Sequence, residues 1–363
     1  MNDQSNPPML DVMFREEGRA GFITLNRGRA LNALTHDMIT QMNRRYLKWA
    51  TAPRIYGVVL EAAPGSRAFC VGGDIRAVTA DIESNLGEAL TFFRDEYQHN
   101  WTLQCFTKPN VALIDGAVMG GGVGISIFGT HRVAGEGFRF AMPETSIGFF
   151  PDIGGGWFLS RMPGETGTYL ALTGRTVGRE DGYYLGIASH CVPSADFDKI
   201  RHAMIESDPI DPVLDGLHRD PGEAPLARHR DVIDRVFDAE TVEDILARLD
   251  GETGAHAEWA RETAATIRAN APFSLKVALR QLRMARAAPT LKDALVIDFR
   301  LARRLVPAHD FREGVRAVLI DKDRSPKWQP ASLAEVSEDS VAAALAPLGE
   351  EELRLTDHWT LID

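Results

Sequence analysis

The stretch Asn110-Val-Ala-Leu-Ile-Asp-Gly-Ala-Val-Met-Gly-Gly-Gly-Val-Gly124 joins a short apolar run to a cluster of glycines. Residues 110–114 have the length and composition of a buried β-strand. The segment from Ala117 to Gly129 begins with glycines and then becomes apolar, which predicts a helix that enters the core. A strand that leads into a helix is the repeating unit of α/β proteins.

The same order of elements is repeated nearer the N-terminus. Gly21-Phe-Ile-Thr-Leu25 and Val58-Val-Leu60 are predicted strands. Between them a helix is predicted from Leu34 to Trp49, with Thr35 as its N-cap and an acidic residue in its first turn. This alternation favours an α/β fold.

The composition changes near Val192, and beyond this point the chain is predicted to be mainly helical. The segment Asp208–Pro225 contains four prolines and is interpreted as a surface excursion or linker. Three later helices are predicted to open with capping boxes. These boxes are Thr241–Asp244, Thr290–Asp293 and Asp310–Glu313. We therefore expect a core over residues 10–195, a helical region over 196–345 and a tail over 346–363.

Composition excludes several classes of function. With 40 Lys and Arg against 51 Asp and Glu, the formal net charge is −11, which disfavours general nucleic-acid binding. The uncharged stretch Gly116–Thr130 is too short to span a bilayer, which takes about 20 residues. The first fourteen residues lack Lys and Arg, unlike a standard signal peptide or an Arg-rich presequence. We expect a cytoplasmic protein that does not bind membranes.

Several familiar motifs are absent. The three cysteines are far apart and form neither a disulfide framework nor a zinc site. The run Gly120–Gly124 lacks the spacing of a dinucleotide-binding loop, and no Walker lysine follows it. Ser126 does not lie in a nucleophile elbow and is expected to be a helix residue. No metal-ligand spacing occurs among the histidines, so no metal is expected.

Two glycine clusters, Arg67–Ile75 and Ile114–Gly124, bring bare backbone to the ends of predicted strands. Glycine allows a ligand to approach main-chain N–H groups closely. If the second cluster opens a helix, its first N–H groups are unpaired and lie at the positive end of the helix dipole. Two such groups from separate loops would form an oxyanion hole. Close helix packing and tight turns are the structural alternative.

A third segment, Phe140–Gly156, contains only two acids, Glu144 and Asp152, and both follow a proline among apolar residues. Carboxylates in apolar surroundings are costly unless paired, and their pKa values tend to rise. They are therefore candidates for a nucleophile or for acid–base work. A structural ion pair is the alternative.

The order of these motifs resembles the crotonase superfamily, whose members stabilise thioester oxyanions or enolates with two backbone N–H groups. The motifs are Leu25-Asn-Arg…Leu31-Asn-Ala-Leu34, Phe69-x-x-Gly-Gly-Asp-Ile75, Asp115-Gly-x-x-x-Gly-Gly-Gly122 and Met142-Pro-Glu-Thr145. The segments Ala141–Gly156 and Asp310–Trp328 are similar to one branch, the 3-hydroxyisobutyryl-CoA hydrolases. The resemblance runs from about residue 20 to residue 330 and implies a spiral of ββα units with a helical C-terminal part.

The resemblance also implies roles for individual residues. The oxyanion donors would be the N–H groups of Gly73 and Gly121. Glu144 would be the catalytic carboxylate and Asp152 the second acid of the hydrolase site. CoA would lie across the loops Arg27–Ala30 and Arg67–Gly73. The expected substrate contacts are Glu96, Arg27, Ala30, Ala68, Asp74 and Gly120. Without the resemblance, Glu96 would be interpreted as a surface helix residue.

Two positions depart from the pattern of the relatives. Enoyl-CoA hydratases carry a glutamate just after the triple glycine, where this chain has Gly124. A hydratase uses two carboxylates to place and activate its water, and losing an acid–base group typically costs about 10²–10⁴-fold. Gly28 stands where many relatives have proline, which says little about chemistry.

The expected function is hydrolysis of a short 3-hydroxyacyl-CoA, as in valine breakdown, without a cofactor beyond the CoA of the substrate. An enoyl-CoA hydratase or isomerase is the rival enzyme, and a silent CoA-binding or assembly protein is the rival of another class. The sequence leaves open the acyl preference, attack by Glu144 or by water, and the oligomer, which is a trimer in many relatives.

Overall fold

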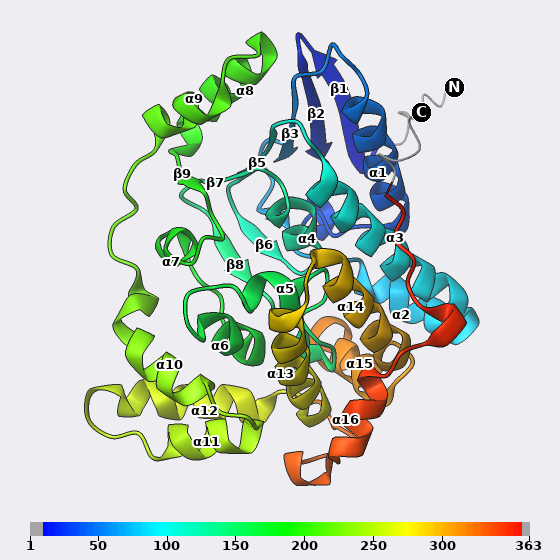
Figure 1. Ribbon diagram of the computed structural model, residues 1–363, viewed down its shortest axis with the longest axis vertical. Coiled ribbons are helices and arrows are strands. Elements are labelled where there is room, and N and C mark those ends of the chain that lie inside the picture. Colours follow the sequence, from blue (N-terminus) through cyan, green and yellow to red (C-terminus); the bar gives the residue numbers. More distant parts are fainter. Residues whose placement is uncertain (1–9, 358–363) are drawn as a thin grey trace, which may run out of the picture.

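The computed structural model describes residues 10–357, except for the side chains of Asp81, Glu83 and Ser84 (Figure 1). Its strands form a six-stranded sheet in the order β1-β2-β3-β5-β7-β9 and a three-stranded sheet in the order β4-β6-β8. The strands of the large sheet are β1 (Val12–Glu17), β2 (Ala20–Leu25), β3 (Gly57–Ala62), β5 (Asn110–Ile114), β7 (His131–Ala134) and β9 (His190–Cys191). Those of the small sheet are β4 (Ala68–Cys70), β6 (Ala117–Met119) and β8 (Arg139–Ala141).

The chain alternates between the two sheets. Each of the pairs β3–β4, β5–β6 and β7–β8 places one strand in the large sheet and the next in the small sheet. Helices follow each pair, and every strand pairing except β1–β2 is parallel. The expected α/β spiral of ββα units is therefore confirmed.

The helices of the first half follow the strands closely. They are α1 (His36–Ala50), α2 (Ile75–Ser84), α3 (Leu86–Cys105), α4 (Gly121–Ile127), α5 (Gly155–Leu159), α6 (Thr166–Thr173) and α7 (Arg179–Tyr184). The predicted N-cap of α1 is confirmed, because the Thr35 hydroxyl accepts a hydrogen bond from Met38 N at 3.2 Å. The helix predicted from Ala117 begins only at Gly121, since residues 117–119 pair with both neighbouring strands of the small sheet.

Only helices and loops occur from Phe197 to residue 357. These helices are α8 (Phe197–Glu206), α9 (Ile210–Leu217), α10 (Arg230–Phe237), α11 (Val242–Asp250), α12 (Ala257–Ala269), α13 (Pro272–Ala287), α14 (Leu291–Leu305), α15 (His309–Val315) and α16 (Glu338–Leu345). The predicted excursion at 208–225 is only partly irregular. It contains α9, because Ile210 and Leu214 are one helical turn apart and both are buried.

The three predicted capping boxes have different outcomes. The box at Thr290 and Asp293 is complete, whereas Thr241 caps α11 through a single bond from Asp244 N. The third box is wrong. Helix α15 begins at His309, and the Asp310 carboxylate instead accepts a hydrogen bond from Gln329 N at 2.7 Å.

One hydrophobic core joins the spiral to the C-terminal helices. Figure 1 shows α13 and α14 beside α5 and α3, and these helices are in contact. Tyr97 and Ile153 of the spiral share a buried cluster with Leu282 and Phe299 of these helices. The other face of the large sheet is covered by α8 and α9. Within residues 10–357, no helix has the length and apolar character needed to cross a membrane.

Candidate active site

The two glycine loops meet at the end of the small sheet. Gly73 follows β4, and Gly121 is the first residue of α4. The N atom of Gly73 lies 3.3 Å from the position that a Cβ on Gly121 would take. Within residues 10–357, neither N–H donates a hydrogen bond to a protein oxygen. Two free N–H groups thus come together, which is the arrangement that an oxyanion hole requires.

The backbone around these N–H groups is held in conformations that favour glycine. Gly72 and Gly120 have φ values of +106° and +46°. Leu34 links the first loop to the turn before α1, donating to Gly72 O and accepting from Asp74 N, each at 2.8 Å. A Cβ on Gly121 would overlap Oε1 of Glu96. Because glycine has no side chain, position 121 leaves room for the carboxyl group of Glu96.

Glu96 belongs to the buried face of α3. It is 2% exposed, and its Oε1 has no hydrogen-bond partner within the described residues. The sequence contained a signal for this burial. Ala89, Phe93, Glu96, Asn100 and Leu103 recur at helical spacing, and all are buried. The interpretation of Glu96 as a surface residue, made without the family resemblance, is therefore wrong.

Glu144 and Asp152 lie in the same region. Glu144 opens the short 3₁₀ helix η2 (Glu144–Ile147) and is 6% exposed, and Asp152 is 5% exposed. A Cβ on Gly120 would lie 3.0 Å from Oε1 of Glu144, so this carboxyl group lies against the glycine next to Gly121. Asp152 Oδ2 accepts a hydrogen bond of 2.8 Å from the hydroxyl of Tyr97. No structural ion pair forms, since within residues 10–357 neither acid contacts Lys or Arg.

Burial raises the pKa of all three carboxyl groups, and the charge of Asp152 adds to the rise at Glu96 and Glu144. Burial, and then the charges of Asp152 and Glu144, raise the pKa of Glu96 well above its ordinary value. Burial and the charge of Asp152 raise the pKa of Glu144 in the same way. Burial raises the pKa of Asp152 to about 7, although the hydrogen bond from Tyr97 lowers it. A group that exchanges its proton near neutral pH, as Asp152 does, is suited to acid–base catalysis.

The segment around Asp152 is held by the C-terminal helices. Asp298 of α14 accepts a hydrogen bond from Gly154 N at 2.7 Å. Gln281 of α13 donates to Pro151 O at 2.9 Å and to Asp298 Oδ1 at 2.6 Å. The chain is thus fixed on both sides of Asp152 by residues more than 120 positions away. Sequence reasoning missed this support because no local pattern marks it.

The two expected CoA loops are tied together by Asn32. Its amide donates to Ala68 O at 3.1 Å and to Phe69 O at 3.0 Å. Asn32 also accepts from Arg27 N at 2.9 Å. The Arg27 guanidinium pairs with Asp74 at 2.7 Å. The first loop therefore lies directly against the second.

The other expected contacts differ in accessibility. Ala30 is half-buried, whereas Ala68 is buried within β4 and its carbonyl oxygen accepts the hydrogen bond from Asn32. Gly120 is buried as the N-cap of α4. Ser126 is a buried helix residue, as expected, and its hydroxyl donates to the backbone of its own helix.

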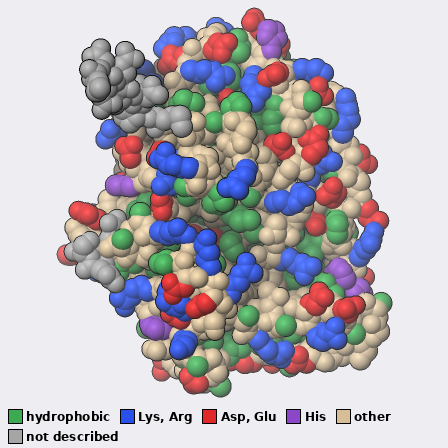
Figure 2. Space-filling view, turned by 180° about the vertical axis from the view of Figure 1, so that it is seen from behind, with side chains coloured by type: hydrophobic (Ala, Val, Ile, Leu, Met, Phe, Trp, Pro, Cys, Tyr) green, Lys and Arg blue, Asp and Glu red, His purple; other side chains and the backbone are tan. Residues whose placement is uncertain are grey.

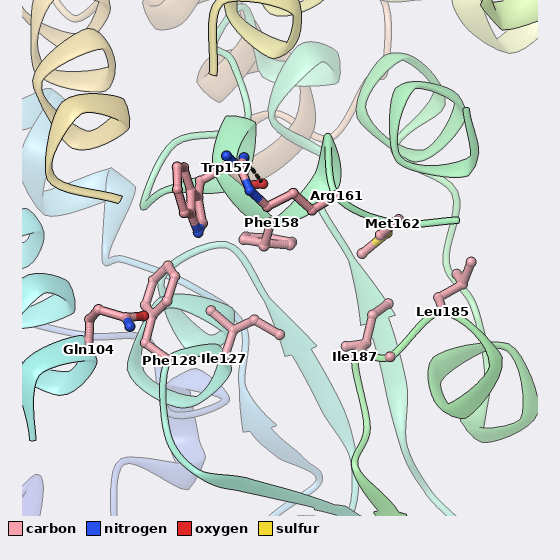
Figure 3. A pocket seen from close by; sticks show the side chains of 10 residues that line it. Gln104, Ile127, Phe128, Trp157, Phe158, Arg161, Met162, Leu185 and Ile187 are labelled. Atoms are coloured by element: carbon pink, nitrogen blue, oxygen red, sulfur yellow. Dashed lines mark hydrogen bonds between the residues drawn. The ribbon is translucent and has the colours of Figure 1, made fainter. Parts of the chain in front are cut away.

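A separate cavity of about 350 Å³ lies at the other end of α4 (Figure 3). Residues of four segments line it, among them Gln104, Phe128, Trp157, Arg161 and Ile187. None of the expected catalytic or substrate-contacting residues lines this cavity. Among residues 10–357 no group of three or more His, Cys, Asp and Glu is placed to hold a metal ion.

Comparisons with known proteins agree with this architecture. The enoyl-CoA hydratase/isomerase family matches residues 20–345. The mitochondrial 3-hydroxyisobutyryl-CoA hydrolase of Homo sapiens is 42% identical over 360 residues, covering 95% of this chain and 90% of the relative. The enzyme of the same name from Danio rerio is 41% identical and covers 95% of this chain and 92% of the relative.

Two solved structures are similar over nearly the whole chain. A carnitinyl-CoA dehydratase from Mycobacterium thermoresistibile has a TM-score of 0.90 at 39% identity, over 96% of this chain and 99% of that one. An enoyl-CoA hydratase from Rhodobacter sphaeroides has a TM-score of 0.89 at 37% identity, over 95% of this chain and 100% of that one. From the two-sheet spiral, the family match and these relatives, we conclude that the chain is a member of the enoyl-CoA hydratase/isomerase family, also known as the crotonase superfamily.

Proposed function

We propose that this protein hydrolyses the thioester of 3-hydroxyisobutyryl-CoA to 3-hydroxyisobutyrate and CoA, a step of valine breakdown. The observation that carries this proposal is the placement of buried Glu144 against Gly120, next to the free N–H groups of Gly73 and Gly121. The vertebrate relatives described above are named for this reaction.

In the proposed reaction the thioester carbonyl oxygen accepts hydrogen bonds from the N–H groups of Gly73 and Gly121. These bonds strengthen as negative charge develops on the oxygen. Glu144 either attacks the carbonyl carbon, which gives a mixed anhydride that water then opens, or takes a proton from an attacking water. The C–S bond breaks in both routes, and CoA leaves as a thiolate.

Asp152 is the group that we propose for proton transfer. With a pKa of about 7, it can give a proton to the leaving thiolate and accept one from water. The overall change consumes one water and yields a carboxylic acid and a thiol. The residues that carry these steps belong to the protein itself, so we propose that no metal or cofactor is needed.

CoA must be bound against an overall charge of −11. Figure 2 shows a face on which Lys and Arg side chains surround a depression lined by apolar side chains. Such a local combination suits a ligand with phosphates and an acyl chain. Cytoplasmic location and assembly into a homo-oligomer such as a trimer stay predictions, and the vertebrate relatives carry the word mitochondrial in their names.

The rival reaction is hydration of an enoyl-CoA. The structure reinforces the argument from Gly124, because a Cβ at this position would lie 2.8 Å from Nδ2 of Asn100 and 3.1 Å from Cβ of Ile153. A glutamate therefore has no room at position 124 unless its neighbours move. The second rival, a silent CoA-binding protein, does not explain why unpaired acids are buried beside two free N–H groups.

Thiol release and hydration can be measured on one preparation of the purified protein. We expect CoA release from 3-hydroxyisobutyryl-CoA to be faster than hydration of crotonyl-CoA. A higher hydration rate would reverse the ranking of the two enzymes. No turnover in either assay, with CoA esters still bound, would instead support the silent CoA-binding protein.

A further inference from the structure

Asn100 is a buried amide that the proposed reaction does not use. Its side chain is 0% exposed. Within residues 10–357, neither Nδ2 nor Oδ1 has a hydrogen-bond partner. A buried amide without partners is costly, and native proteins nearly always satisfy such groups with protein, water or ligand. This residue is therefore suited to a partner that arrives with the substrate.

The position of Asn100 relates it to the catalytic groups. Helices α3 and α4 are in contact, and Glu96 of α3 lies against Gly121 of α4. Asn100 is one helical turn beyond Glu96, and its Nδ2 lies against Gly124, one turn along α4. Ile153, the neighbour of Asp152, also lies against Gly124, with its Cβ 3.1 Å from the position that a Cβ on Gly124 would take. The amide thus lies about one turn, roughly 5 Å, from the expected oxyanion hole.

This separation matches a small acyl chain. With the carbonyl oxygen at Gly73 and Gly121, carbon C3 lies two C–C bonds of about 1.5 Å each beyond the carbonyl carbon. A hydroxyl on C3 can therefore reach a group about one helical turn from the oxyanion hole. We propose that Asn100 selects acyl-CoA substrates with a hydroxyl on C3, through a hydrogen bond from its Nδ2 to the hydroxyl oxygen. This inference rests on the proposed function and deepens it.

The absence of a side chain at position 124 belongs to the same arrangement. Hydratases carry a glutamate there, which helps to place the water used in hydration. Here glycine leaves room for the Asn100 amide at that position. A neutral amide can bind a hydroxyl that is already present but cannot deprotonate water. The pair Asn100 and Gly124 therefore suits recognition of a hydroxyacyl chain better than its formation.

The test compares two esters that differ only in the hydroxyl, 3-hydroxyisobutyryl-CoA and isobutyryl-CoA. Their dissociation constants are measured by calorimetry in Glu144→Gln protein, with and without Asn100→Leu. We expect Asn100→Leu to weaken binding of the hydroxylated ester about 10- to 100-fold, the usual effect of losing a buried hydrogen bond. Binding of isobutyryl-CoA should change much less. The same loss of preference is expected in kcat/KM when Glu144 is present.

His99 provides a matched control on the same helix. It is also 0% exposed with both ring nitrogens unpartnered within the described residues, but it packs against Tyr46. His99→Phe should leave the preference between the two esters unchanged. If Asn100→Leu does not fold, Asn100→Met carries the same test, because its flexible apolar side chain adapts to tight sites.

The proposal for Asn100 is overturned if its variants keep the preference for the hydroxylated ester. It is also overturned if both esters lose affinity equally, since Asn100 would then hold a structural water or support packing. Failure of the proposed function is a separate result. Wild-type protein would then bind both esters but release no thiol, and the ratio of the two dissociation constants would still report on Asn100.

Discussion

At the scale of single residues, the candidate site gathers three acids without a compensating cation. Glu96, Glu144 and Asp152 are buried, and no Lys or Arg within residues 10–357 pairs with them. Such a cluster lowers stability, because each carboxyl group must stay protonated or hold an unpaired charge in the folded protein. Functional sites commonly carry such a cost.

The cost at Asp152 depends on pH. In the unfolded chain Asp ionises near 3.8, whereas burial raises the pKa of folded Asp152 to about 7. Because the pKa of Asp152 is higher in the folded protein, its contribution to the free energy of unfolding is largest below pH 4, where the group is protonated in both states. This contribution is lost as the pH rises to 7. We expect Asp152→Asn to stabilise the protein at pH 8 by up to about 4 kcal/mol, at roughly 1.4 kcal/mol per pKa unit. Urea unfolding should show a smaller gain at pH 5, and an equal gain at both values would contradict this cause.

Glu144→Gln should abolish thioester cleavage while CoA-ester binding persists. The amide keeps the shape of the side chain but cannot act as a nucleophile or a base. Thiol release and calorimetric binding measure the two effects separately. In wild-type protein, activity should fall as the pH drops below neutrality, because burial raises the pKa values of Glu144 and Asp152. Near-normal turnover in the variant would remove Glu144 from the mechanism.

Gly121 allows the N–H group to be tested separately from the space around it. Any side chain at this position meets Glu96, so Gly121→Ala measures the clash while keeping the N–H. Gly121→Pro adds loss of the N–H, and proline is tolerated at the first position of a helix. We expect proline to lose about 10²–10³-fold more kcat than alanine, the typical effect of one oxyanion donor.

Circular dichroism must show that both Gly121 variants are folded. Equal activities of the alanine and proline variants would place the oxyanion donor elsewhere. The glycine run would then have only its structural role in close packing.

At the scale of elements, the site depends on helices that contribute no catalytic group. Helix α14 supports Asp152 twice, through the bond from Gly154 to Asp298 and through Phe299, whose ring packs edge-on against Tyr97 at 6.5 Å. Burial and the charge of Asp152 raise the pKa of Asp298 well above its ordinary value, although hydrogen bonds oppose the shift.

Asp298→Ala should lower both stability and kcat. It leaves Gly154 N buried without its acceptor, which costs about 1–3 kcal/mol. Thermal melting and thiol release measure the two effects, and KM should change little because the CoA loops are on other elements. Asp298→Asn retains one acceptor and serves as the conservative control. Equal losses in both variants would show that the hydrogen bond to Gly154 is not the cause.

At the scale of the whole molecule, the spiral shares one core with the helices from α10 to α16, while α8 and α9 pack on the other face of the large sheet. Residues as distant as Tyr97 and Phe299 belong to one buried cluster, and the loop of Asp152 is held from α13 and α14. The boundary expected near residue 195 therefore separates two kinds of secondary structure within a shared core. The tail also contacts the spiral, since Trp101 donates to Asp357 at 2.7 Å.

We therefore expect a single unfolding transition in scanning calorimetry, with equal calorimetric and van't Hoff enthalpies. A shared core unfolds as one unit because neither part can keep its buried surface without the other. Two separate transitions would show that residues 10–195 and 196–345 are independent domains.

The sequence by itself determined the α/β class, the three strands β2, β3 and β5 of the large sheet, the capped helix α1 and, through the family resemblance, the residues that the site brings together. These features depend on local physics, namely the spacing of hydrophobic residues, helix capping and the backbone freedom of glycine. They also depend on sequence motifs that follow one another in a fixed order along the chain. The three-residue strands β4, β6 and β8 were not predicted, because strands so short have no pattern of their own and form only by pairing with one another.

Only the tertiary structure decided the surroundings of the site. Three hydrogen bonds around the site join residues 55 to 144 positions apart, namely those from Tyr97 to Asp152, from Gly154 to Asp298 and from Gln281 to Pro151. The lack of a partner for the Asn100 amide depends on what packs around that side chain. Burial is a property of the packed chain, and it is the main cause of the raised pKa values of the three acids, whereas the hydrogen bond from Tyr97 lowers the pKa of Asp152. The sequence named the acids, and packing determines their proton affinity.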